Sequence, residues 1–196
     1  MNEEDFKEVL GELINISFGS ATATIADLFD NFATLRVPSI NIIHLGEVND
    51  LVMGDDNEQK IYITTQQFKG KFQGEIALVI DTESARNMHI IVDEEDGDDE
   101  NAVQQSLLEI SNILGSSCIG KLAELLVTNV TFAPPTVDYA KQLIKDIENS
   151  PYSKVIVIST ILEFEELQIF GKLIILFSDE MFAWLEQALE DFMDTI

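Results

Sequence analysis

The chain has 196 residues, enough for one large domain or two small ones with a substantial buried core. Its 36 acidic and 11 basic residues give a formal net charge of −25, which argues against nucleic-acid binding and against docking on an anionic membrane. One cysteine excludes an intrachain disulfide, and with only two histidines it cannot build a usual zinc site. The acidic N-terminus is unlike a signal peptide, and no apolar run approaches the roughly 20 residues of a membrane span, so the cytoplasm is the expected compartment.

The residues predict the same order of elements twice along the chain: a long helix, a short strand, two longer strands and a closing helix. In the first half these are expected at about 3–32, 34–44, 59–67, 72–81 and 82–92. In the second half they are expected at about 99–128, 130–137, 153–164, 168–178 and 179–195. The strands are predicted from runs such as KIYITTQQF and KVIVISTILEF, which are rich in β-branched residues. An additional helix is predicted in the second half only, at DYAKQLIKDIEN, residues 138–149.

An internal repeat explains this order. When the chain is shifted by 97 residues without gaps, nine of the thirty positions from Val9 to Pro38 are identical, and the match extends to about residue 80. The predicted fold is therefore α/β (α+β) and pseudo-twofold-symmetric, a single domain over 1–196 with repeats 1–97 and 98–196. The acidic run DEEDGDDE between the repeats is expected to be a solvated loop.

Each long helix carries a Glu and an Asn three residues apart. At about 100° per residue, Glu12 and Asn15 fall opposite the apolar stripe of the first helix. Glu109 and Asn112 occupy the same place in the second helix. Because the repeats have diverged at most positions and both retain this pair, we interpret it as functional.

The small residues near these Asn side chains also need an explanation. Asn and Gly both lower helix stability, Gly by about 1 kcal/mol relative to Ala. Yet Gly19 follows Asn15 by one turn, and Ser116 follows Asn112 in the same way. We interpret these small side chains as leaving room for the surface of another molecule. Ile119, one turn further, interrupts the polar stripe of the second helix.

The pattern E-x-x-N, followed by 22 residues and a Pro, resembles the motif of the CheC-type chemotaxis phosphatases, which include CheC, CheX and FliY. The matching residues are Glu12, Asn15 and Pro38 in the first copy, and Glu109, Asn112 and Pro135 in the second. The first position of the family motif, usually Asp or Ser, is Glu8 here and Gln105 in the second copy. We interpret Pro38 and Pro135 as shaping the helix-to-strand connection, without a chemical role. The resemblance covers the whole chain and implies a two-site CheC-like member.

The resemblance implies a phosphatase that hydrolyses the aspartyl phosphate of a CheY-type response regulator in bacterial or archaeal chemotaxis. The receiver would supply Mg²⁺ and a Lys, so this chain would need no metal or cofactor of its own. Asn15 and Asn112 would orient the attacking water without adding negative charge near the phosphoryl group. Glu12 and Glu109 would dock on the receiver Lys.

The main alternative is a non-catalytic binding or scaffold protein of the chemotaxis apparatus or the flagellar switch, where the same fold occurs. Retention of both Asn residues favours catalysis. A relative with one working site remains a further alternative, and a CheD-type deamidase is a partner that some family members bind. Cys118 and Trp184 are expected to pack in the core, and His44 and His89 to have no catalytic role.

Overall fold

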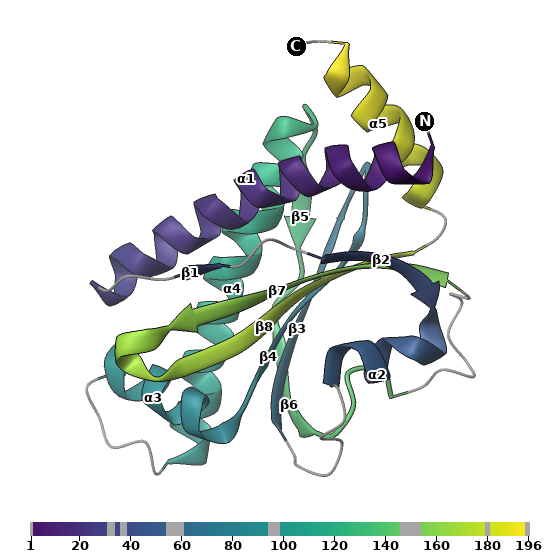
Figure 1. The fold of residues 1–196 in the computed structure, drawn as a ribbon. Helices are drawn as coiled ribbons and strands as arrows, with labels where there is room; N and C mark the ends of the chain where they lie inside the picture. The colour runs from purple at the N-terminus through teal and green to yellow at the C-terminus, as the bar shows by residue number, and fades with distance from the viewer. Residues whose placement is uncertain are drawn as a thin grey trace.

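The computed structural model describes residues 2–30, 34–35, 39–53, 61–93, 99–145, 154–178 and 181–194. These residues form one eight-stranded sheet with helices on both faces (Figure 1). The helices are α1 Glu3–Phe29, α2 Val48–Met53, α3 Thr82–Asp93, α4 Glu100–Leu125 and α5 Phe182–Met193. The strands are β1 Thr34–Leu35, β2 Ser39–His44, β3 Ile61–Gly70, β4 Gly74–Ile80, β5 Val130–Phe132, β6 Thr136–Ala140, β7 Lys154–Phe164 and β8 Ile169–Ser178. The predicted α+β class is confirmed.

The two halves of the chain interlock within this sheet. The strand order is β1-β7-β8-β4-β3-β5, with β2 also paired to β7 and β6 also paired to β3, and every pair is antiparallel. The short strands of each half therefore pair with the long hairpin of the other half. In the centre, Ala77 of β4 lies opposite Ile174 of β8, 97 residues later in the chain. This register is compatible with a repeat of 97 residues, and the symmetry of the two halves stays a prediction.

The long hairpins depart from the ungapped shift of 97 residues. Ile76 of β4 lies opposite Gln66 of β3, but Leu173, 97 residues after Ile76, lies opposite Thr160 of β7. By strand register Thr160 is thus the counterpart of Gln66, at a spacing of 94. The second hairpin is longer by three residues, because 12 residues separate Thr160 from its partner Leu173, whereas 9 separate Gln66 from its partner Ile76.

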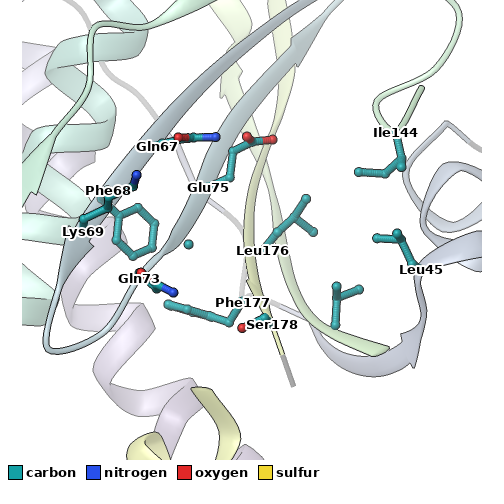
Figure 2. A pocket seen from close by; sticks show the side chains of 12 residues that line it. Leu45, Gln67, Phe68, Lys69, Gln73, Glu75, Ile144, Leu176, Phe177 and Ser178 are labelled. Atoms are coloured by element: carbon teal, nitrogen blue, oxygen red, sulfur yellow. The ribbon is translucent and has the colours of Figure 1, made fainter. Parts of the chain in front are cut away.

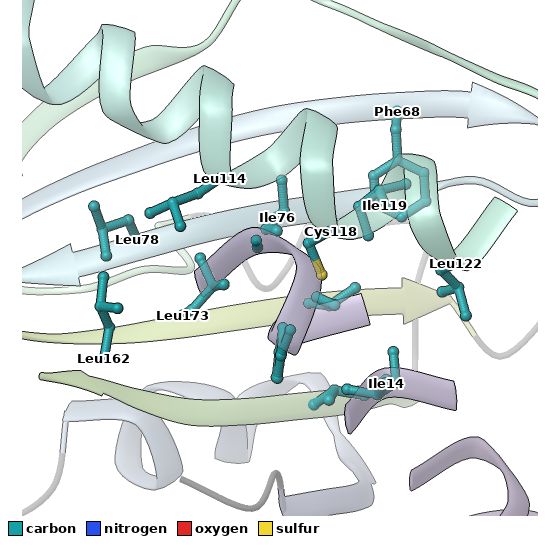
Figure 3. Packing of buried hydrophobic residues seen from close by; sticks show 14 of the residues in the cluster. Ile14, Phe68, Ile76, Leu78, Leu114, Cys118, Ile119, Leu122, Leu162 and Leu173 are labelled. Atoms are coloured by element: carbon teal, nitrogen blue, oxygen red, sulfur yellow. The ribbon is translucent and has the colours of Figure 1, made fainter. Parts of the chain in front are cut away.

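The larger core lies between the sheet and helices α1, α3, α4 and α5. The buried stripe of α1 includes Leu10, Ile14 and Ile25, and α4 contributes Leu114 and Cys118 among others (Figure 3). The N-terminus of α1 is capped by Asn2, and the N-terminus of α4 by Asp99 from the acidic run. Capping and apolar periodicity together explain why these helices begin and pack where the sequence predicts.

A smaller core fills the opposite face of the sheet, where the sequence prediction is partly wrong. It holds Val48 and Val52 of α2, a short helix in the first half that was not predicted. The additional helix predicted at 138–149 is wrong for 138–145, and residues 146–149 lie outside the described residues. Residues 138–140 instead complete the ladder of β6 on β3, where the rings of Tyr62 and Tyr139 lie 4.9 Å apart. Pairing with β3 therefore overrides the local helix propensity.

The short strand predicted at 130–137 is divided in two. Ala133, Pro134 and Pro135 separate β5 from β6, because proline has no N–H to donate to a strand ladder. Pro135 thus joins two strands, so its predicted place in a helix-to-strand connection is wrong. The strand predicted at 34–44 is likewise described as β1 and β2, and Pro38 lies outside the described residues.

Helix α1 is long and apolar enough to cross a membrane by length and composition, contrary to the expectation from the sequence. It is also a core helix, with Phe6, Leu10, Leu13 and Ile14 almost completely buried. It packs against α4, α5 and strands β1 and β2. The packing of this stripe accounts for the apolar composition of the helix.

Candidate functional site

The candidate side chains of the two long helices lie on the exposed faces of α1 and α4, as predicted. The exposed residues are Glu8, Glu12 and Asn15 on α1, and Gln105, Glu109 and Asn112 on α4. In the same polar stripes, Ser116 is half-buried, whereas Ile119 is completely buried in the core. The inclusion of Ile119 in the polar stripe was therefore wrong, because the position lies at the edge of the wide apolar face of α4.

The two Asn side chains have different surroundings. The side chain of Gln66, 1% exposed on β3, donates from Nε2 to Oδ1 of Asn112 at 2.7 Å and to the carbonyl oxygen of Ala133 at 3.0 Å. For Asn15, no side-chain hydrogen bond to any described residue is present. The amide of Asn112 is therefore tied to the sheet, and the amide of Asn15 is not.

Gly115 is explained by this contact. A Cβ at Gly115 would lie 2.5 Å from Oε1 of Gln66 and 3.1 Å from Cγ2 of Ile76, so only glycine leaves room for the Gln66 amide. A Cβ at Gly19 would meet nothing within 4 Å. The two glycines near the Asn residues thus have different roles: Gly115 serves internal packing, and Gly19 lies beside open space.

A second polar contact joins α4 to β3 next to Asn112. Thr64 Oγ1 donates to Ser111 Oγ at 2.6 Å, and both side chains are buried. In α1, the residues 97 positions before Ser111 and Gly115 are Ile14 and Phe18, which are buried and apolar. Helix α4 is therefore fixed to β3 by polar and small residues where α1 presents bulky apolar ones.

No sequence signal identified Gln66 or Thr64. Both lie in the run KIYITTQQF, which has the β-branched and aromatic residues of an ordinary strand and four consecutive polar residues, none of which is singled out. Gly115 was the one detectable hint, since a buried glycine within a helix indicates close approach of another group. The group that approaches Gly115 is the side-chain amide of Gln66, which lies 49 residues earlier in the chain. Patterns within a short stretch of sequence do not reveal a contact over this separation.

Figure 2 shows a pocket of the sheet, which has a volume of about 380 Å³. It is lined by ends of β3, β4 and β8, and its polar groups include Gln67, Glu75 and Ser178. Burial raises the pKa of the Glu75 carboxyl, and a hydrogen bond from Gln67 opposes this shift. None of Glu12, Asn15, Glu109 and Asn112 lines this pocket, so the candidate site is an exposed helix surface that only a partner could enclose.

The remaining conspicuous residues have structural surroundings. Cys118 is completely buried, and burial raises the pKa of its thiol. The ring of Trp184 stacks on Phe72 at 5.4 Å. His89 is buried, with Nδ1 2.8 Å from Ser106 Oγ, and His44 is exposed. Across the described ranges, no three His, Cys, Asp or Glu side chains gather in a way that could hold a metal ion.

Comparison with solved structures finds the same fold in chemotaxis and flagellar proteins. The chain is similar to FliY from Thermotoga maritima, with a TM-score of 0.77, 18% identity, and 98% of each chain covered. It is similar to CheX from the CheX–CheY–BeF3–Mg²⁺ complex of Borrelia burgdorferi, with a TM-score of 0.55, 16% identity, and 84% and 97% of the two chains covered. It is also similar to FliM from the FliM–SpeE complex of H. pylori, with a TM-score of 0.70, 9% identity, and 97% of each chain covered.

The protein family is assigned from a family model, because structural similarity at such low sequence identity shows only the fold. The model described as chemotaxis phosphatase CheX matches residues 62–159, which is half of the chain. The matched residues contain Gln66, Glu109, Asn112, Gly115 and Ala133, and they do not contain the first Glu–Asn pair. The chain therefore belongs to the CheX/CheC-type family of chemotaxis phosphatases.

Proposed function

We propose that this protein is a phosphatase that hydrolyses the aspartyl phosphate of a CheY-type response regulator in the cytoplasm. The observation that carries the proposal is the exposure of two Glu–Asn pairs, one on each long helix, at matching positions of a chain that belongs to this family. The CheX of Borrelia burgdorferi was solved in complex with CheY, BeF3 and Mg²⁺, which supports a receiver domain as the partner.

The proposed reaction requires few catalytic groups from the phosphatase itself. An acyl phosphate has a good leaving group, and in the proposed complex the Mg²⁺ and Lys of the receiver neutralise the phosphoryl oxygens. What remains is to hold a water in line with the phosphorus, which is a positioning task. Asn15 and Asn112 each provide a neutral donor and acceptor for this water, and a carboxylate in their place would repel the phosphate.

The two Glu residues would hold the receiver in place. Glu12 and Glu109 lie one turn before the Asn residues and are exposed, so each could form an ion pair with the receiver Lys. An ion pair at an interface contributes mainly to orientation and to the rate of association. In this arrangement Glu sets the position of the receiver and Asn sets the position of the water.

Changing the two Glu residues should weaken the complex without abolishing hydrolysis. The double variant Glu12→Gln with Glu109→Gln is expected to raise the Kd for a BeF3-activated receiver several-fold and to make it less sensitive to salt. Titration calorimetry at two salt concentrations measures both effects. The matched control is Glu4→Gln with Glu100→Gln, which makes the same charge change at exposed positions of the same helices. Equal effects of the two double variants would mean that Glu12 and Glu109 act only through net charge.

Metal dependence should follow the receiver and not this chain. We expect Mg²⁺ to show no saturable binding to the isolated protein at millimolar concentration, while dephosphorylation of the receiver requires Mg²⁺. Calorimetry with Mg²⁺ and the protein alone, beside a phosphate-release assay with and without EDTA, checks both statements. Stoichiometric Mg²⁺ binding that is lost in Glu12→Gln or Glu109→Gln would contradict this mechanism.

A non-catalytic role in the flagellar switch is the second candidate. It is favoured by the FliY and FliM structures, which match 97% or more of this chain, whereas the CheX from Borrelia burgdorferi covers 84% of it. Release of phosphate from a panel of phosphorylated receiver domains separates the two roles. The phosphatase proposal expects faster release from a CheY-type receiver, and the scaffold alternative expects binding with unchanged release from every receiver.

A further inference from the structure

We infer that Gln66 is a positioning residue for Asn112, and that it makes the second site the faster of two unequal sites. This inference rests on the proposed phosphatase function. It starts from one buried amide, that of Gln66, which lies beneath Asn112, whereas no described residue hydrogen-bonds to the side chain of Asn15.

The contacts of Gln66 fix the orientation of both amides. The carbonyl oxygen of Ala133 can only accept, so the nitrogen of Gln66 must face it. The same nitrogen lies 2.7 Å from Asn112, whose oxygen must therefore face Gln66. Asn112 is left with its own NH2 group and one oxygen lone pair for a water. A lone pair that accepts a hydrogen from this water leaves the oxygen of the water free to attack.

Gln66 is itself held from several sides. Its side chain is 1% exposed, it lies on a strand paired on both sides, and its oxygen occupies the space above Gly115. Ala133, whose carbonyl accepts from Gln66, donates its own N–H to the Gln67 carbonyl at 2.9 Å. Pro134 and Pro135 follow and restrict the backbone at this point. The motif proline therefore lies two residues from the carbonyl that orients Gln66.

Among the residues that the structure describes, none gives the first site this support. Phe18 of α1 is the counterpart of Gly115 of α4, and its side chain is 1% exposed. At this position the first half therefore packs an aromatic ring, where the second half packs the Gln66 amide. The strand counterpart of Gln66 is Thr160, and no hydrogen bond links it to Asn15. The Asn15 side chain must select the reactive orientation from several accessible ones, whereas the hydrogen bond from Gln66 already restricts the Asn112 amide to one orientation. Pre-organisation of this kind raises kcat and leaves KM nearly unchanged.

The test uses Gln66→Met, which keeps the length of the side chain and removes the donor. In an Asn15→Ala background, where only the second site can work, Gln66→Met is expected to lower kcat for the phosphorylated receiver about fivefold or more, with KM unchanged. In an Asn112→Ala background the same change should leave kcat unaltered. The matched control is Gln67→Met, the same substitution at the next residue of β3, where the side chain is exposed. A loss of kcat of equal size in both backgrounds would overturn the inference, because it would indicate a general structural effect.

A second measurement does not depend on activity. The side-chain NH2 order parameters from ¹⁵N relaxation are expected to be higher for Asn112 than for Asn15, and Gln66→Met should lower the value for Asn112 only. Equal order at Asn15 and Asn112 in the wild type would overturn the inference whatever the kinetic assay gives. Failure of the wild type to accelerate phosphate loss would instead overturn the proposed function, with the order parameters unaffected.

A second variant keeps the test decisive if Gln66→Met does not fold. Gly115→Ala adds a methyl group 2.5 Å from Oε1 of Gln66, while Ala itself favours a helix. It is expected to displace the Gln66 amide and to reproduce the loss of kcat in the Asn15→Ala background. A folded Gly115→Ala protein with full second-site kcat and an unchanged Asn112 order parameter would contradict the role given to Gln66.

Discussion

Replacing both Asn15 and Asn112 by Ala is expected to return decay of the phosphorylated receiver to its intrinsic rate. Each Asn would position the attacking water at its own site, and loss of such a group costs about tenfold or more in rate, or above about 1.4 kcal/mol of barrier. Each single variant should retain activity from the other site. If Gln66 acts as inferred, Asn112→Ala should lose more activity than Asn15→Ala. Stopped-flow phosphate release with the three variants measures these rates.

The folded state of these variants provides the control. Asn15 is exposed and has no side-chain hydrogen bond to a described residue, so Asn15→Ala should change the free energy of unfolding by about 0.5 kcal/mol or less. Asn112→Ala also removes the hydrogen bond that buried Gln66 donates, so it should cost about 1 kcal/mol. Asn101→Ala, at an exposed position near the start of α4, makes the same substitution outside the candidate site and should leave the rate unchanged. A folded double variant that hydrolyses as fast as the wild type would remove Asn from the mechanism.

Replacing Phe68 by Ala is expected to give the largest loss of stability, about 3–5 kcal/mol. The side chain is completely buried on β3, and its ring lies 5.5 Å from that of Phe72 and 5.7 Å from that of Phe177. The change removes these contacts and leaves a cavity beside the strand that carries Gln66. Urea unfolding followed by circular dichroism measures the loss.

Phe170→Ala is the matched control for this change. Phe170 lies on β8 and is 44% exposed, so the same truncation should cost much less than at Phe68, about 1 kcal/mol or below. Similar losses for the two variants would mean that the aromatic cluster does not hold the end of the sheet together. A loss below about 1 kcal/mol for Phe68→Ala would contradict the core packing described above.

Local periodicity was sufficient to predict the two long helices and their exposed Glu–Asn pairs. The apolar stripe of each helix is wide and regular, so Glu12, Asn15, Glu109 and Asn112 could only lie opposite the core. The fold class followed from the same patterns. These features depend on residues within one or two helical turns, which is the range over which sequence patterns are informative.

The errors have a common cause in pairing between distant segments. Residues 138–140 favour a helix locally but complete the ladder on β3, and the Tyr62–Tyr139 ring contact stabilises that choice. Gln66 was missed because its role depends on α4 packing against β3. The sequence repeat itself concealed the difference between the two sites, since Glu, Asn and Pro recur while the residues beneath them do not.

Turnover of a phosphorylated receiver by substoichiometric wild-type protein tests the central claim most directly. A CheY-type receiver would be phosphorylated with a small-molecule phosphodonor, freed of excess donor, and mixed with one molecule of this protein per twenty of receiver in the presence of Mg²⁺. The phosphatase proposal predicts phosphate release from the whole receiver pool at a rate proportional to the amount of protein added. Unchanged decay of the receiver, in a mixture where the two proteins form a complex, would contradict it and leave the binding role in its place.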